Sequence, residues 1–304
     1  MVDTETLGGG ARLPFVQPEL DRRRFLIAGA GLVGMLGAGC GSSGSKASVT
    51  TSGGSSPGPF AVRSNVFDFI AGINQRVSFA LETNSGSPIH PTDPVTVQIG
   101  RLDRPLDASL ATTLHGDGLA NPYLLTYHQF DAPGLYKLRV SYQGGQSDLP
   151  IQVIAASDTP IPLAGKPMIV SPTPTNAAPL GVSPLCTAQP PCPLHQVSLD
   201  AALAAHRPVA LQFATPALCT SRQCGPTLDN LVAVHQAYAD RVTFIHCEIY
   251  TDLSGNSSVG AVSAYHLEHE PMLLLAGPDG VVKERIDNAY DRGEASDALN
   301  RLVG

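Results

Sequence analysis

The sequence has no tryptophan, few aromatic residues of any kind and few charged residues. Aromatic residues make up 6% of the 304 residues, and Asp, Glu, Lys and Arg together make up 15%. No long basic run occurs, and the formal net charge is -7. These absences argue against nucleic acid or an anionic membrane surface as the main partner, because both are bound through concentrated positive charge.

Long apolar runs are also missing. The Gly/Ala-rich apolar stretch from Phe25 to Gly39 is shorter than the roughly 20 residues that a membrane-spanning helix needs. Because it follows Asp21-Arg-Arg-Arg-Phe25, residues 1–40 resemble a twin-arginine export signal. Its end, Leu36-Gly-Ala-Gly-Cys40, resembles a bacterial lipobox, which implies lipidation of Cys40.

In that family the leucine usually stands one residue closer to the cysteine, so cleavage by an ordinary signal peptidase is the alternative. Either way, we expect an exported protein that works outside the cytoplasm. With lipidation, it would be anchored to the membrane through Cys40. Residues 41–59 are rich in Ser, Gly and Pro, which predicts a flexible tether.

Residues 60–155 alternate between apolar and polar, as at Val77, Phe79 and Leu81, which is typical of half-buried strands. Turn-rich breaks separate these runs, so we predict an all-β immunoglobulin-like sandwich of about seven antiparallel strands. Within it, Asp131-Ala-Pro-Gly-Leu-Tyr136 resembles the corner of immunoglobulin-like domains in which a tyrosine hydroxyl bonds back to the chain.

Residues 156–194 are rich in Pro, Thr and Ala without sustained periodicity, which indicates a connector. Hydrophobic periodicity after it predicts an α/β domain over residues 195–304. The expected helices cover residues 198–205, 226–238, 259–265 and 293–302, and the expected strands cover 208–213, 242–249, 272–276 and 281–286.

This order, with Cys219 and Cys224 between the first strand and the second helix, resembles the thioredoxin-like superfamily. The resemblance implies a two-domain protein with a thioredoxin-like fold behind the sandwich, and thiol-disulfide exchange at the two cysteines. It also implies that Pro271, which opens the strand from Met272, is the cis-proline facing them and bounds a substrate groove. A trans turn proline is the alternative.

The spacing of Cys219 and Cys224 limits how they pair. Within one continuous helix their Cα atoms would lie about 7.5 Å apart along the axis, beyond the limit of about 7 Å for a disulfide. A pair therefore requires Cys219 in the loop before the helix, with Cys224 near the helix start, where unpaired amides favour a thiolate. Which cysteine attacks stays open, because the family order favours Cys219 and the helix start favours Cys224.

Three departures from the family bear on activity. Leu218 stands where the family has tryptophan, four residues rather than two separate the cysteines, and Gln212 replaces a buried acid. Since glutamine cannot carry a proton, slow or absent turnover is expected if nothing replaces the acid. The opposing interpretation is a non-catalytic binding module with permanent disulfides.

The other cysteines are expected to be structural. Cys186 and Cys192 lie in the connector without an activating charge, so we predict a disulfide staple that stabilises by about 2 kcal/mol. Zinc binding by these cysteines and His195 lacks an evident fourth ligand. Cys247, in an apolar strand, is expected to pack as a small hydrophobe.

A further alternative is a Sco-like copper chaperone, which has the same fold and binds copper through two cysteines and a later histidine. Here the ligands would be Cys219, Cys224 and His269, a soft set suited to copper. Our principal expectation involves no cofactor. The expected partners are protein thiols or disulfides on the outer side of the cytoplasmic membrane.

Overall fold

The computed structural model describes residues 58–304. The export signal, the lipidation of Cys40 and nearly all of the tether lie outside the described residues. Among the helices that are described, none is both long enough and apolar enough to cross a membrane. The described residues are rich in β-strands and form few helices, all of them short.

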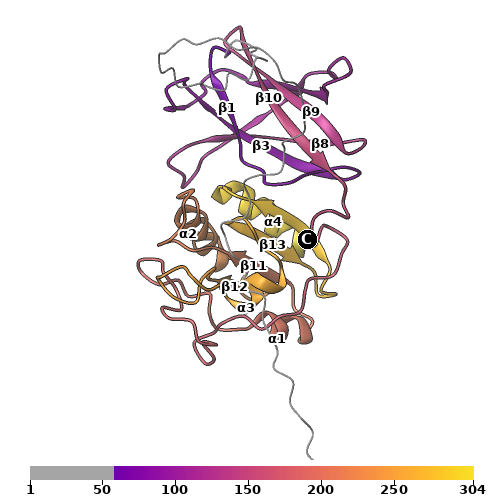
Figure 1. The fold of residues 1–304 in the computed structure, drawn as a ribbon. Coiled ribbons are helices and arrows are strands. Elements are labelled where there is room, and N and C mark those ends of the chain that lie inside the picture. The colour runs from indigo at the N-terminus through magenta and orange to yellow at the C-terminus, as the bar shows by residue number, and fades with distance from the viewer. Residues whose placement is uncertain (1–57) are drawn as a thin grey trace, which may run out of the picture. The chain divides into compact units, whose positions relative to one another are not determined.

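The first part of the described chain consists of ten strands in two five-stranded sheets (Figure 1). One sheet has the order β1-β3-β8-β7 with β4 beside β3, and the other has the order β2-β10-β9-β5-β6. The strands are β1 (Ala61–Ser64), β2 (Phe69–Ile70), β3 (Asn74–Glu82), β4 (Pro88–Ile89), β5 (Thr96–Arg101), β6 (Leu110–Ala111), β7 (Thr113–His115), β8 (Tyr123–Gln129), β9 (Gly134–Tyr142) and β10 (Gly145–Ile154).

This part has more strands than the sequence predicted, and one pair differs in direction. Strands β2 and β10 run parallel, whereas the other pairs here are antiparallel. The additional strands are two or three residues long, which is too short for an alternating pattern to identify. The long strands behave as expected, since Val77, Phe79 and Leu81 of β3 enter one apolar core.

The predicted tyrosine corner is present before β9. The Tyr136 hydroxyl donates to the carbonyl of Ala132 at 3.0 Å and accepts from its backbone N–H at 3.3 Å. The ring itself is buried in the core of the two sheets. This side chain therefore ties the turn before β9 to the core.

The second part is a four-stranded sheet with helices on both faces. The order is β12-β11-β13-β14, with β11 parallel to β12 and antiparallel to β13. Its elements are α1 (Leu199–Ala204), β11 (Val209–Phe213), α2 (Cys224–His235), β12 (Thr243–Cys247), α3 (Gly260–Ala264), β13 (Met272–Ala276), β14 (Val282–Asp287) and α4 (Arg292–Val303). Every helix and strand expected after residue 195 occurs; β13 has the expected ends, and each of the others is shifted by one to three residues at one end or both.

Alternation along β11 divides its side chains between the two faces of this sheet. Val209, Leu211 and Phe213 pack in a core with residues of α1 and α3, whereas Ala210 packs in a core with residues of α2 and α4. When both faces of a strand are covered, its sequence is a continuous apolar run, because no side chain of the strand meets water. This accounts for the sequence around Val209–Phe213.

The connector contains no helix or strand, yet it is packed against this sheet. Ile161 and Met168 join the core beside α1 and α3, and Cys186 and Leu194 join the core beside α2 and α4. Residues that were expected only to link two domains thus cover both faces of the second sheet. This coverage brings Cys186 and Cys192 close to the end of β12.

The two parts of the described chain share a buried polar contact. Arg76 of β3 forms an ion pair with Glu294 of α4, with 2.5 Å between Nε and Oε1, and also donates to the carbonyl of Ala289. The hydroxyl of Tyr123 donates to the same Glu294 carboxylate. The described residues accordingly belong to one compact unit, and the domain boundaries predicted inside it stay predictions.

Candidate functional site

The loop from the end of β11 to the start of α2 carries the first candidate site. Cys224 is the first residue of α2 and is fully buried, whereas Cys219 lies in the preceding loop and is partly exposed. This is the arrangement that the spacing required for a pairing. Both cysteines are free thiols in the structure.

The Cys219 sulfur is surrounded by hydrogen-bond donors. Its Sγ accepts from the backbone N–H of Cys224 at 3.4 Å and lies 3.2 Å from the Ser221 hydroxyl. A hydrogen bond from the Cys224 thiol, with smaller contributions from Ser221 and from backbone amides, lowers the pKa of Cys219 to about 5 against the opposing effect of burial. The same contact and burial raise the pKa of Cys224. Of the two thiols, Cys219 therefore loses its proton more readily, and Cys224 keeps its proton.

This difference predicts the pH dependence of Cys219 alkylation. Iodoacetamide reacts with the thiolate, so its rate constant at Cys219 should change little from pH 8 to pH 6 and fall to half near pH 5. An ordinary cysteine, with a pKa of about 8.5, would lose reactivity roughly tenfold per unit over the same range. Mass spectrometry of the Cys219 peptide measures the rate.

The matched variant is Cys224→Ala, which removes the strongest donor to the Cys219 sulfur. In this variant, we expect the pH at which Cys219 alkylation is half-maximal to rise by a measurable fraction of a pH unit or more. In Ser221→Ala, the same midpoint should rise less. A midpoint near 8.5 in the unmodified protein would show that Cys219 is an ordinary thiol.

Glu270 and Pro271 stand directly before β13. The peptide bond between them is cis, as the resemblance implied for Pro271, and not the trans bond of the alternative. A carboxylate oxygen of Glu270 and the sulfurs of Cys219 and Cys224 all lie within 4.8 Å of one another. Burial, followed by the charge of Cys219, raises the pKa of Glu270 to about 7.

The structure does not bring His269 into this group. Its imidazole stacks on Phe67, with ring centroids 4.9 Å apart, and the third ligand-type side chain beside the cysteines is Glu270. His269 and Glu270 are neighbours in a bend before β13, yet only Glu270 lies beside the two cysteines. The ligand set considered for copper is therefore not assembled here.

Gln212 is buried and bonded rather than free to act on a thiol. Its side-chain oxygen accepts from the Tyr290 hydroxyl at 2.7 Å, and its amide donates to the carbonyl of Phe213. Glu270 is the acidic group that lies next to the cysteines. Sequence reasoning missed this role, because Glu270 was considered only as the residue before a proline.

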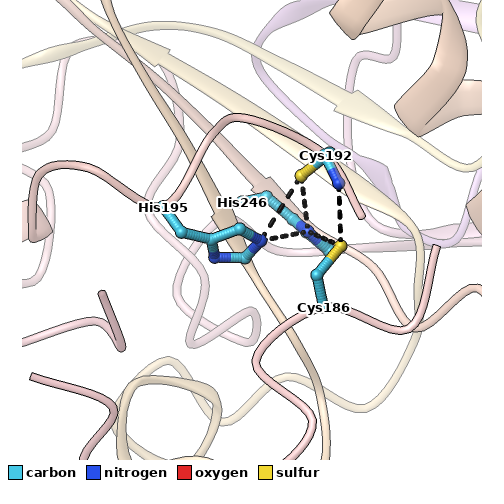
Figure 2. A group of neighbouring side chains, drawn as sticks. All are labelled: Cys186, Cys192, His195 and His246. Atoms are coloured by element: carbon cyan, nitrogen blue, oxygen red, sulfur yellow. Dashed lines mark hydrogen bonds between the residues drawn. The ribbon is translucent and has the colours of Figure 1, made fainter. Parts of the chain in front are cut away.

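A second group consists of Cys186, Cys192, His195 and His246, whose ligand atoms all lie within 4.8 Å of one another (Figure 2). The first three precede α1, and His246 projects from β12. Figure 2 shows the four side chains turned toward one another from these two segments. His195 and His246 are almost completely buried.

His246 is the member of this group that the sequence did not reveal. It lies more than 50 residues from the cysteines, in an apolar strand, and no local spacing links it to them. Cys186 and Cys192 are free thiols in the structure, and their predicted disulfide stays a prediction. Cys247, the next residue along β12, is fully buried in the core beside α1 and α3.

The fold and these sites define a β-rich protein with paired cysteines beside a carboxylate and with a separate group of two cysteines and two histidines. No protein-family model and no curated protein matches the chain.

Among solved structures, the chain is similar to MTB dsbF, described in mixed oxidized and reduced forms, at 12% identity and a TM-score of 0.29 over 44% of this chain and 96% of that one. It is also similar to the PKD domain of the human VPS10 domain-containing receptor SorCS2, at 17% identity and a TM-score of 0.19 over 40% of this chain and 99% of that one. A third similarity is to the ZirS C-terminal domain, at 13% identity and a TM-score of 0.20 over 49% of this chain and 98% of that one. All three similarities are weak.

Proposed function

We propose that this protein catalyses thiol-disulfide exchange through Cys219 and Cys224, on a thioredoxin-like domain. The observation that carries the proposal is the difference between the two thiols. Cys219 is partly exposed and its pKa is lowered to about 5, whereas Cys224 is buried and its pKa is raised. Such a pair suits an attacking thiolate and a resolving thiol.

The position of the pair supports the thioredoxin-like assignment. The cysteines follow the interior strand β11 and meet the start of α2, and Glu270, two residues before the neighbouring strand β13, lies beside them. Unpaired amides at a helix start stabilise a thiolate there. The sheet order and the placement of Pro271 agree with the family layout.

The reaction proceeds in two exchange steps. The Cys219 thiolate attacks one sulfur of a substrate disulfide, forming a mixed disulfide and releasing a substrate thiolate that takes up a proton. The Cys224 thiol then loses its proton and attacks the Cys219 sulfur, which forms the Cys219–Cys224 disulfide and releases the second substrate thiolate. The substrate gains two electrons, and an external dithiol restores the two cysteines.

Glu270 is the proton acceptor for the second step. The buried Cys224 thiol must lose a proton before it attacks, and the Glu270 carboxylate lies within 4.8 Å of its sulfur. With a pKa of about 7, this carboxylate can both accept and release a proton near neutral pH. It would supply the acid-base function that Gln212 cannot.

Glu270→Gln should therefore slow resolution of the mixed disulfide by about a hundredfold, the lower end of the usual contribution of a general base. The rate of this step should also lose its inflection near pH 7, while the first attack by Cys219 is largely retained. Stopped-flow measurement of both steps between pH 5.5 and 8.5 tests this. Glu268→Gln, an exposed neighbour on the same segment, is the matched control. Equal rates in both variants would remove Glu270 from the mechanism.

The experiment that tests the proposed activity is reduction of a fluorescent glutathione disulfide with dithiothreitol as the electron source. We expect many turnovers per chain and complete loss after alkylation at Cys219. A chain that never exceeds the uncatalysed rate would favour the binding-module alternative, in which the cysteines only stabilise the fold.

We also propose that the substrates are protein thiols or disulfides met after export, with the chain held at the membrane through a lipid on Cys40. The resemblance of residues 1–40 to an export signal supports this proposal. Mass spectrometry of the N-terminal peptide from the native membrane fraction tests it. A chain that begins at a residue other than Cys40 and carries no lipid would exclude the lipid anchor.

A further inference from the structure

The group of Cys186, Cys192, His195 and His246 is separate from the exchange site and has the composition of a metal centre. We propose that these four side chains bind one Zn²⁺ ion in a closed tetrahedral site. Two thiolates and two imidazoles are a common ligand set of structural zinc. The proposal does not depend on the activity of Cys219 and Cys224.

The separations between the ligand atoms fit a tetrahedron of zinc dimensions. With Zn–S bonds of about 2.3 Å and Zn–N bonds of about 2.0 Å, tetrahedral ligands lie about 3.3 Å apart for two nitrogens and about 3.5 Å apart for sulfur and nitrogen. His246 Nδ1 and His195 Nε2 are 3.2 Å apart. The Cys192 sulfur lies 3.3 Å from each of these nitrogens, and the Cys186 sulfur lies 3.7 Å from His246 Nδ1.

The hydrogen bonding of His246 prepares its inner nitrogen as a ligand. Its Nε2 lies 3.1 Å from the carbonyl of Ala214, an acceptor only, so Nε2 carries the proton and donates. In the neutral ring, Nδ1 then presents a lone pair to the two sulfurs and to His195. A zinc-bound histidine usually donates a hydrogen bond from the ring nitrogen that does not bind the metal. That bond fixes the orientation of the ring and its tautomer.

Charge and burial favour a divalent ion with these ligands. Zn²⁺ with two thiolates and two neutral imidazoles has no net charge, so the burial of the group leaves no uncompensated ion. The Cys186 sulfur also accepts the backbone N–H of Cys192 at 3.3 Å, a contact that stabilises a thiolate. Four protein ligands leave no open position, which indicates a structural rather than a catalytic ion.

Binding is a simple exchange of protons for metal. Zn²⁺ replaces the protons of the two thiols, so two protons are released and no electrons move. The ion would join the connector to β12. Through Thr187, whose hydroxyl accepts from the N–H of Ala217 at 3.1 Å, the connector also contacts the loop that carries Cys219.

The test uses the purified mature chain, reduced and then dialysed against Zn²⁺ or Co²⁺ alone. We expect one Zn²⁺ per chain by native mass spectrometry, retained through buffer exchange. With Co²⁺ we expect the intense visible absorption of a tetrahedral site together with thiolate charge-transfer bands. These spectra require no variant, so they stay informative if a ligand substitution prevents folding.

Variants then assign the ligands. Cys186→Ser and His195→Gln should each reduce the stoichiometry to near zero, whereas the double variant Cys219→Ser, Cys224→Ser should keep one Zn²⁺. Zn²⁺ binding that is lost in the Cys219→Ser, Cys224→Ser double variant and kept in Cys186→Ser and His195→Gln would overturn the proposal. So would the absence of a retained ion, a preference for Cu(I) without retention of Zn²⁺, or a Cys186–Cys192 disulfide that persists in the reduced chain.

Discussion

Cys219→Ser is expected to abolish disulfide exchange, whereas Cys224→Ser is expected to stop the reaction at a covalent intermediate. A serine hydroxyl at position 219 is not ionised at neutral pH, so no nucleophile of comparable strength remains at the exposed position. With serine at position 224, Cys219 still attacks, but no thiol resolves the adduct. The expected result is no turnover in either variant, with a mixed disulfide accumulating only in the second.

Non-reducing electrophoresis and intact mass after incubation with glutathione disulfide measure the adduct. Cys247→Ala is the matched control, because Cys247 is buried in the core and lies outside both candidate sites. It should retain turnover, with some loss of stability for the cavity that it creates. A stable adduct on Cys219→Ser would reverse the roles that we assign to the two thiols.

Arg76→Ala is expected to reduce the free energy of unfolding by about 3–5 kcal/mol, because it leaves the buried Glu294 carboxylate without its partner. Only 7% of the Arg76 side chain and 2% of the Glu294 side chain are exposed. Urea denaturation of the mature chain measures the change. The size of the effect also measures how strongly β3 and α4 depend on each other.

Two controls separate the buried pair from a general effect of losing an arginine. Arg63→Ala breaks an exposed pair with Glu82 on neighbouring strands and should cost less than about 1 kcal/mol. Arg76→Met combined with Glu294→Gln removes both charges while leaving an acceptor for Tyr123, and should recover much of the lost stability. If Arg76→Ala and Arg63→Ala reduced the free energy of unfolding equally, the result would contradict the buried contact between Arg76 and Glu294.

Sequence reasoning succeeded where local patterns determine structure. The run Met272–Ala276 was predicted to the residue, because a proline marks its start and a Gly-containing turn its end. The tyrosine corner was predicted from six consecutive residues and is present. Short edge strands such as Phe69–Ile70 were missed, since two residues have no period to detect.

In the candidate sites, too, the features set by local sequence were predicted and those set by long-range contacts were not. The loop position of Cys219 followed from helix geometry together with the assumption that it pairs with Cys224, and the structure agrees with it. In contrast, His246 meets Cys186 only because an irregular Pro-rich segment folds back on β12, and the sequence contains no signal for that contact. The proximity of Glu270 to the cysteines likewise depends on how β13 pairs with β11.

The central claim is that Cys219 and Cys224 form an exchanging pair, and their reduction potential tests it most directly. The mature chain would be equilibrated in glutathione and dithiothreitol buffers, alkylated, and analysed by mass spectrometry of the peptide that contains both cysteines. We predict a reversible two-electron transition at a potential above about -300 mV, the range of labile and catalytic disulfides. A disulfide that stays oxidised well below that potential would contradict the account and make the pair a structural bond.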